Sequence, residues 1–146
     1  MTSGQMVIDT NVFIRHGLTG LTERGLFSAV VLQEITAGAP DSSAVRDLGA
    51  LGQRLERRGR LLVPNGEDWY HAGRVLNSLY RGQRSHRRGH TAAIPKEEQQ
   101  RLVRDVLIAR SAKRANAAVV TYNRGDFEKI RRFCNVQIKD PEDFFL

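Results

Sequence analysis

Short apolar runs separated by longer mixed stretches recur along the chain. Five of these runs are too short for a helix, and each predicts a buried strand: 6–8, 27–31, 61–63, 117–121 and 136–138. The first run stops abruptly at Asp9, and two small polar residues follow it. The run 117–121 ends in a similar way, at the polar turn 122–126.

The stretches between the strands carry apolar residues at helical spacing. A helix is predicted from Ser42 to about Arg58, capped by 41–43, and a second helix follows 65–68. The apolar face of this second helix is predicted to consist of Trp69, Ala72, Val75, Leu76 and Leu79. A long helix opens at Glu97 and is apolar nearly all the way round between 102 and 112, which is typical of a helix packed between other elements. A short basic helix is predicted after the turn 122–126.

Strands that alternate with helices indicate an α/β fold with a central parallel β-sheet flanked by α-helices. The length of 146 residues predicts a single domain over residues 1–146, since it can bury one substantial core. Residues 81–90 contain no apolar side chain, so a basic loop over about 81–95 is expected inside that domain.

The balance of charge favours an anionic partner. The formal net charge is +7, and only four of the 23 basic residues are lysine. Arginine binds phosphate bidentately and stacks on bases, so this composition favours nucleic acid over a generic basic surface. The candidate residues for binding nucleic acid are Arg84, Arg87, Arg88, Arg15 and Arg124.

Other features of the composition limit where the protein works. A single Cys134 excludes an internal disulfide framework and fits the reducing cytoplasm. No apolar run approaches the roughly 20 residues of a membrane span, and the polar N-terminus does not resemble a secretory signal. A cytoplasmic protein without a membrane partner is therefore expected.

Four acids occupy positions that suit a ligand better than a solvated surface. Asp9 and Asp126 fall just beyond predicted strands, and Glu34 is expected at the start of the helix after the second strand. Asp105 lies inside the nearly all-apolar helix, where a carboxylate is costly unless something satisfies it. The alternative for Asp9 is a simple helix N-cap.

The alternative for Asp105 is a structural salt bridge, with Arg101 or Arg104 as its partner. In a parallel sheet, however, the four acid positions can converge at one edge of the strands. Two carboxylates about 5 Å apart repel by about 3 kcal/mol at an effective dielectric near 20. Such a cluster must either protonate or hold a cation, and hard oxygen ligands suit Mg²⁺ or Mn²⁺.

These motifs together resemble those of the PIN-domain ribonucleases. The resemblance rests on 7–11 (Val-Ile-Asp-Thr-Asn), Glu34 with Gly38, Asp105 with 108–109, and 121–127, and it extends to the ending 139–145. It covers the chain from end to end. Within that family, the sequence is most similar to the VapC-type toxins of toxin–antitoxin pairs.

The resemblance implies a PIN-like domain with a Mg²⁺- or Mn²⁺-dependent acidic site that cleaves RNA, leaving 5′-phosphate and 3′-hydroxyl ends. It further implies neutralisation by a cognate antitoxin, and commonly a homodimer. Carried over residue by residue, the metal ligands and catalytic acids are Asp9, Asp105, Glu34 and Asp126. The side chains that would orient them are Thr10, Asn11, Thr121 and Asn123. The long basic segment before the Asp105 helix departs from the family pattern.

Two rival functions have distinct expectations. An aspartyl phosphatase needs a second acid two positions after the nucleophile, and that position is Asn11 here. A non-catalytic RNA- or DNA-binding protein with a degenerate or structural acidic site would explain the arginines. It leaves Asp105 in an apolar helix without a purpose.

Overall fold

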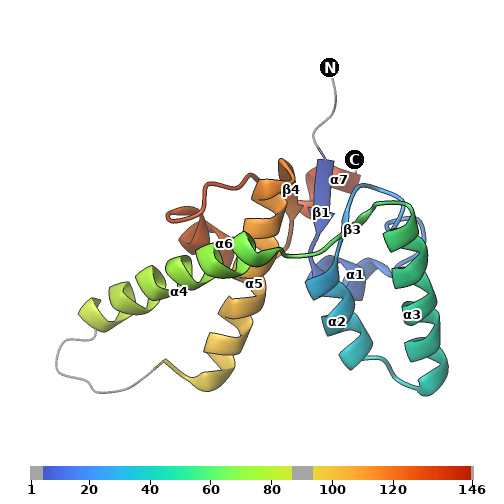
Figure 1. Ribbon diagram of the computed structural model, residues 1–146, viewed down its shortest axis with the longest axis horizontal. Helices are drawn as coiled ribbons and strands as arrows, with labels where there is room; N and C mark the ends of the chain where they lie inside the picture. The colour runs from blue at the N-terminus through green and yellow to red at the C-terminus, as the bar shows by residue number, and fades with distance from the viewer. Residues whose placement is uncertain (1–4, 87–93, 146) are drawn as a thin grey trace.

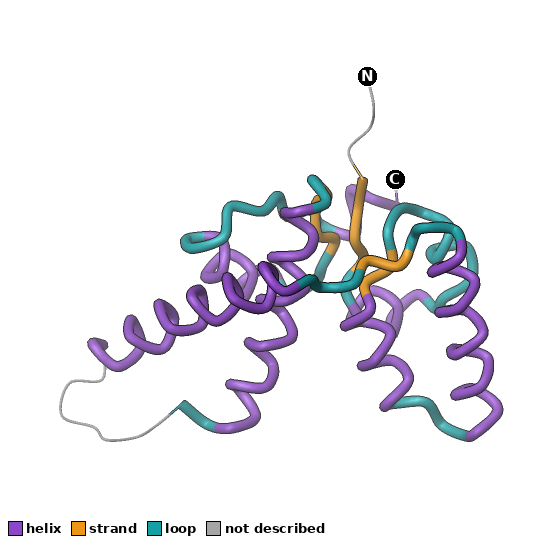
Figure 2. Tube along the Cα trace, viewed as in Figure 1, coloured by secondary structure: helices purple, strands orange, loops and turns teal. Residues whose placement is uncertain are grey.

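The structure of the protein is a computed structural model that describes residues 5–86 and 94–145, with the side chains of 83–86 left out. Its strands are short and parallel, and they lie at the centre of the molecule among the helices (Figure 2). One sheet has the order β1-β4-β5 and the other consists of β2 and β3. The strands are β1 (Gln5–Ile8), β2 (Phe27–Ser28), β3 (Leu61–Leu62), β4 (Ala117–Val120) and β5 (Ile138–Lys139).

Strand β1 connects the two sheets, which places it at the centre of the strands. Its ladder with β4 runs from Gln5–Ala117 to Ile8–Val120, all in parallel register. On its other side, the Leu26 amide donates to the Met6 carbonyl at 2.9 Å. Gly25 permits this approach, because its φ is +101° and a Cβ there would lie 2.4 Å from the Met6 carbonyl oxygen.

Helices surround the strands in two groups (Figure 1). The group on the left of the figure contains α4 (Gly66–His86), α5 (Lys96–Arg114) and α6 (Arg124–Arg131). The group on the right contains α2 (Ala29–Ala37) and α3 (Ser42–Arg57). The short helices α1 (Thr10–His16) and α7 (Pro141–Phe145) follow β1 and β5.

Helix α5 is the central helix that its apolar surface predicts. It packs on α4, α6, α2 and the strands β1 and β4. Val106, Ile108, Ala109 and Ala112 are fully buried. Asp105 is therefore carried on the most enclosed helix in the described part of the chain.

Three details of the predicted elements are wrong. The strand expected over 27–31 ends at Ser28, because the Ser28 hydroxyl accepts hydrogen bonds from the amides of Val30 and Val31 and starts α2. The loop expected from residue 81 begins later, since α4 continues through His86. Arginine, glutamine and serine are adequate helix formers, so a helix can extend beyond the core without burying anything.

The third error concerns Trp69, which was predicted on the apolar face of its helix. Trp69 is instead 58% exposed, and the neighbouring Tyr70 is 66% exposed. The buried stripe of α4 runs through Ala72, Val75 and Leu79, but it begins at Asp68. The first turn is rotated so that Asp68 faces inward, where it binds Arg114 at 2.8 Å. This turn exposes Trp69.

In the described ranges, no helix is long and apolar enough to cross a membrane.

Candidate functional site

Asp9 lies immediately beyond the carboxyl end of β1, at the N-cap of α1. Its Oδ1 accepts the Thr10 amide at 2.8 Å, so the capping interpretation holds. Its Oδ2 accepts hydrogen bonds from the Thr121 hydroxyl at 2.7 Å and from the side-chain amide of Asn11 at 3.3 Å. Asp9 is only 4% exposed, and burial raises its pKa despite these hydrogen bonds.

Two polar side chains, those of Thr121 and Asn11, connect Asp9 to the end of the neighbouring strand. Thr121 follows β4, and its Oγ1 accepts the Asn123 amide at 2.9 Å while its hydroxyl donates to Asp9. The side-chain Oδ1 of Asn11 accepts a hydrogen bond from the backbone amide of Tyr122 at 3.2 Å. Each of these side chains has several fixed partners, so the Asp9 carboxylate is held in one orientation.

Asp105 is buried with far less support. It is 6% exposed, and its hydrogen bond from the Asn123 side-chain amide is long, at 3.5 Å. Neither Arg101 nor Arg104 forms a salt bridge with it, so the structural ion pair considered for Asp105 is absent among the described residues. Burial, followed by the charges of Asp9, Asp126 and Glu34, raises the pKa of Asp105 to about 8.

Arginines partly neutralise the other two acids. Arg101 Nε lies 3.1 Å from Asp126 Oδ2, which also accepts the Asn123 side-chain amide at 2.9 Å. Arg104 Nε lies 3.4 Å from Glu34 Oε2. Burial raises the pKa of Glu34, while the charge of Arg104 acts in the opposite direction.

Glu34 lies in the middle of α2, whereas the sequence predicts it at the start of the helix. The difference follows from Ser28, which caps α2 so that the helix begins at Ala29, three residues earlier than the predicted strand allows. Glu34 still reaches the other acids, because its charge raises the pKa of Asp105 and the charge of Asp9 raises its own. The structure therefore brings Asp9, Glu34 and Asp126 within electrostatic reach of Asp105.

The donor atoms suit a hard divalent cation, which would relieve the repulsion that raises the pKa of Asp105. The Thr10 hydroxyl is a further buried oxygen beside the Glu34 carboxylate. Within 5–86 and 94–145, however, no three His, Cys, Asp or Glu side chains are gathered closely enough to hold an ion. Arg101 and Arg104 engage two of the four carboxylates instead.

The predicted RNA-binding arginines have different positions. Arg15 lies over the Tyr122 ring, 4.9 Å from its centroid, and Arg124 pairs with Glu128 and Asp140. The side chain of Arg84, at the end of α4, lies outside the described part of the chain, as do Arg87 and Arg88 entirely.

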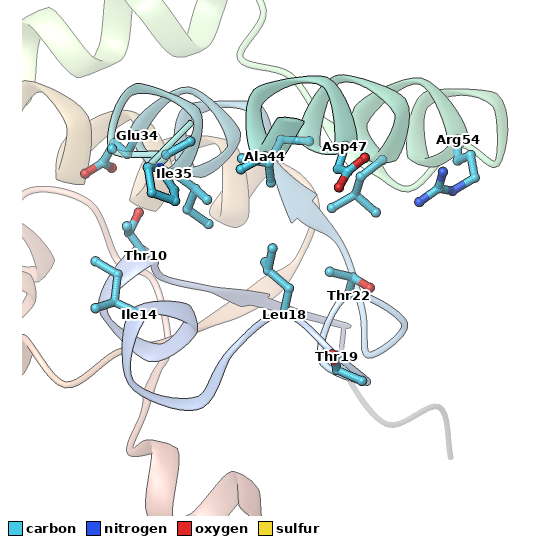
Figure 3. A pocket seen from close by; sticks show the side chains of 15 residues that line it. Thr10, Ile14, Leu18, Thr19, Thr22, Glu34, Ile35, Ala44, Asp47 and Arg54 are labelled. Carbon is cyan, nitrogen blue, oxygen red and sulfur yellow. The ribbon is translucent and has the colours of Figure 1, made fainter. Parts of the chain in front are cut away.

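A groove of about 580 Å³ extends from the acids between α1 and the helices α2 and α3. Figure 3 shows Thr10 and Glu34 at one end and Arg54 at the other. Ile14, Leu18 and Ile35 lie along it, and Ile14 is 78% exposed. This groove is not apparent in the amino-acid sequence, since its walls come from segments that lie far apart along the chain.

The burial and ion pairing of Asp68 were also not predicted from the sequence. It is fully buried and binds Arg114 at 2.8 Å, with Arg110 at 3.5 Å. It also exchanges hydrogen bonds with Asn65 across the first turn of α4, as in a capping box. The signal for this acid was its place three residues after an N-cap residue.

Comparison with known proteins identifies the fold. No protein-family model and no curated protein matches the sequence. Among solved structures, a chain of the DNA-bound VapBC from Salmonella typhimurium is 24% identical, with a TM-score of 0.59, over 94% of this chain and 98% of that one. A chain of VapBC-1 from nontypeable Haemophilus influenzae is 20% identical, with a TM-score of 0.57, over 92% and 96%. A chain of FitAcB from Neisseria gonorrhoeae is 18% identical, with a TM-score of 0.56, over 94% and 98%.

These likenesses extend over nearly the whole length of each chain. The protein therefore shares the fold of these chains, and the α/β fold with parallel strands flanked by helices that the sequence predicts is confirmed.

Proposed function

We propose that this protein is a Mg²⁺- or Mn²⁺-dependent endoribonuclease. The observation that carries the proposal is Asp105, a buried carboxylate whose pKa is raised to about 8 by burial and by three neighbouring acids. A protein does not retain such repulsion for stability, and perturbed acids in one place are typical of functional sites. The basic composition supports a polyanionic substrate.

Each residue of the site has a role in this proposal. Asp9 and Asp105 would hold the ion, with Glu34 and Asp126 completing its ligands after leaving their arginines. When bound, the ion polarises the scissile phosphoryl group and makes water a stronger nucleophile. Thr121 and Asn11 would keep Asp9 in its orientation, and Asn123 would do the same for Asp105 and Asp126. Arg101 and Arg104, once released, would be free to bind substrate phosphates.

The test is RNA cleavage by purified protein with Mg²⁺ or Mn²⁺. Asp9→Asn and Asp105→Asn should each lower the rate at least about 100-fold, because each loses a ligand charge. Asp143→Asn, an exposed acid on α7, is the matched control and should cleave like the wild type. Equal cleavage by all four proteins would overturn the assignment.

The proposal includes a protein partner. The similar structures are VapBC and FitAB complexes, which supports a toxin of this fold that a cognate antitoxin neutralises in the cytoplasm. The groove of Figure 3 offers an apolar surface that leads to Glu34 and Thr10, so a partner segment there would cover the acids. A homodimer, expected from the resemblance, is tested by the mass of the protein in solution.

The partner is tested by co-expression with the product of a small neighbouring gene. Ile14→Asp places a charge in the groove and should abolish copurification while leaving RNA cleavage intact. Val45→Asp, an exposed apolar residue on α3 that does not line the groove, is the control. Copurification of the Ile14→Asp protein at the wild-type level would exclude the groove.

A further inference from the structure

A second cavity lies away from the acids and has the opposite charge. It has a volume of about 360 Å³ and is enclosed by α4, the last turns of α5 and the residues that follow α6. Its polar lining residues are His71, Arg74, Ser78, Arg110 and Lys113, with Phe133 beside them. No acid lines it.

The positive charge of this cavity is not balanced locally. Asp68 pairs with the lining residue Arg110 and also with Arg114, so one carboxylate faces two arginines. The pair with Arg110 is long, at 3.5 Å, and Arg110 Nε is buried without a hydrogen bond in the described residues. Over the same residues, Arg74 and Lys113 have no ion-pair partner.

The rim adds an aromatic surface. Phe133 is 48% exposed although most residues of its size pack into the core. An aromatic ring beside several cations is the combination that binds a nucleotide, whose base stacks while its phosphate accepts hydrogen bonds. Arginine and lysine supply the donors, and the Ser78 hydroxyl can add one more.

The position of the cavity fits a substrate that reaches the acids. Arg110 and Lys113 follow Asp105 on α5 by five and eight residues, which is about 8 to 12 Å along the helix axis. Phe133 follows Asp126 by seven residues, beyond the end of α6, so the second helix leads in the same way from the acids to the cavity. A single strand of RNA covers this separation with a few nucleotides.

We propose that this cavity binds one nucleotide of single-stranded RNA, with Arg74, Arg110 and Lys113 on its phosphate and Phe133 against its base. The inference rests on the proposed function, and it specifies how the substrate is held at a distance from the reacting bond. A free nucleotide presents the same chemistry, so the experiment includes both forms.

The experiment measures the affinity of a short fluorescent single-stranded RNA for the protein in EDTA, where no metal supports cleavage. Arg74→Gln with Lys113→Gln removes two unpaired charges and leaves Asp68 its partners. This double variant should bind about tenfold more weakly, and the slope of log affinity against log salt should fall by about 1.4. Arg46→Gln with Arg57→Gln makes the same charge change on α3, away from the cavity, and should weaken binding less than about twofold.

Phe133→Leu tests the base. It should weaken binding at least about fivefold with an unchanged salt slope, because stacking contributes about 1–3 kcal/mol per base. Adenosine monophosphate and inorganic phosphate are then compared as competitors of the RNA. Competition by the mononucleotide well below the concentration needed for phosphate supports a nucleotide site, while equal potency overturns the role of the base.

The outcomes separate this inference from the proposed function. Equal affinity of the two double variants overturns the cavity site, even if the wild type cleaves RNA with Mg²⁺. If the wild type binds RNA but never cleaves it, while the Arg74 and Lys113 variant binds more weakly than its control, the nuclease proposal fails and the cavity site stands.

Discussion

Asp68 and Asp105 are two buried aspartates on neighbouring helices with opposite surroundings. Asp68 is fully buried but accepts hydrogen bonds from Arg114 and the Asn65 amide, and it pairs with Arg110. Asp105 is 6% exposed and has one long hydrogen bond, while burial and then three neighbouring acids raise its pKa to about 8. The first acid is compensated and stabilises the fold. The second acid is not compensated, which is typical of a functional rather than a structural carboxylate.

The largest effect is expected when compensation is removed from Asp68. Asp68→Asn keeps the shape but leaves the charges of Arg110 and Arg114 unpaired beside a buried amide. The free energy of unfolding should fall by about 3 kcal/mol, or about 10 °C in melting temperature. Thermal melts with Asp143→Asn as control measure this. A loss below about 1 kcal/mol would mean that the arginines find other partners.

Asp105→Asn should change the free energy of unfolding in the opposite direction, so that the variant is more stable than the wild type. Its folded pKa, about 8, lies above its unfolded value of 3.8, so between these limits the folded protein retains a proton that the unfolded chain has released. Stability is therefore lost as pH rises from about 4 to about 8. Two pH units of this difference correspond to about 3 kcal/mol.

The measurement compares melting temperatures at pH 5 and pH 8 in EDTA. Asp105→Asn should be more stable than the wild type at pH 8, with a smaller gain at pH 5. Part of the wild-type slope should remain, since the pKa values of Asp9 and Glu34 are also raised. A variant that is less stable at both values would show that Asp105 supports the fold, as Asp68 does.

A divalent cation should compensate the charge of Asp105, much as the arginines compensate the charge of Asp68. Mg²⁺ or Mn²⁺ at about 100 times its Kd should stabilise the wild type by about 2.7 kcal/mol through mass action. The shift should be larger at pH 8 than at pH 5, because protons compete for the same oxygens. Asp105→Asn should lose most of the shift, whereas Asp143→Asn should keep it. An equal shift in both variants would place the ion elsewhere.

The comparison of Asp68 with Asp105 also explains which features of the structure can be predicted from the sequence. The burial of Asp105 follows from its place in an apolar helix, and the position of Asp9 follows from the strand that it ends. These are local patterns, so the parallel α/β fold and the four acid positions could be inferred from them.

The surroundings of Asp68 were not predictable in the same way. Arg110 and Arg114 come from a helix some 40 residues later, and an Asn65-to-Asp68 pattern looks like an ordinary solvated helix start. The place of Glu34 within its helix was missed because Ser28 stops a run that is apolar enough for a longer strand. One side-chain hydroxyl decided between strand and helix there, against the hydrophobic pattern.

The smallest effect is expected at Arg104, when it is compared with Arg114. Both bind a single acid through Nε, but Glu34 is 23% exposed whereas Asp68 is fully buried. Exposed ion pairs contribute about 0–1 kcal/mol, so Arg104→Gln should lower the free energy of unfolding by about 0.5 kcal/mol. Arg114→Gln should cost several times more, because it strands a buried carboxylate. Urea unfolding of the two variants measures both differences. Equal losses would show that Arg104 holds the acidic site together as firmly as Arg114 holds α4 to α5, and release of Glu34 to a metal would then be costly.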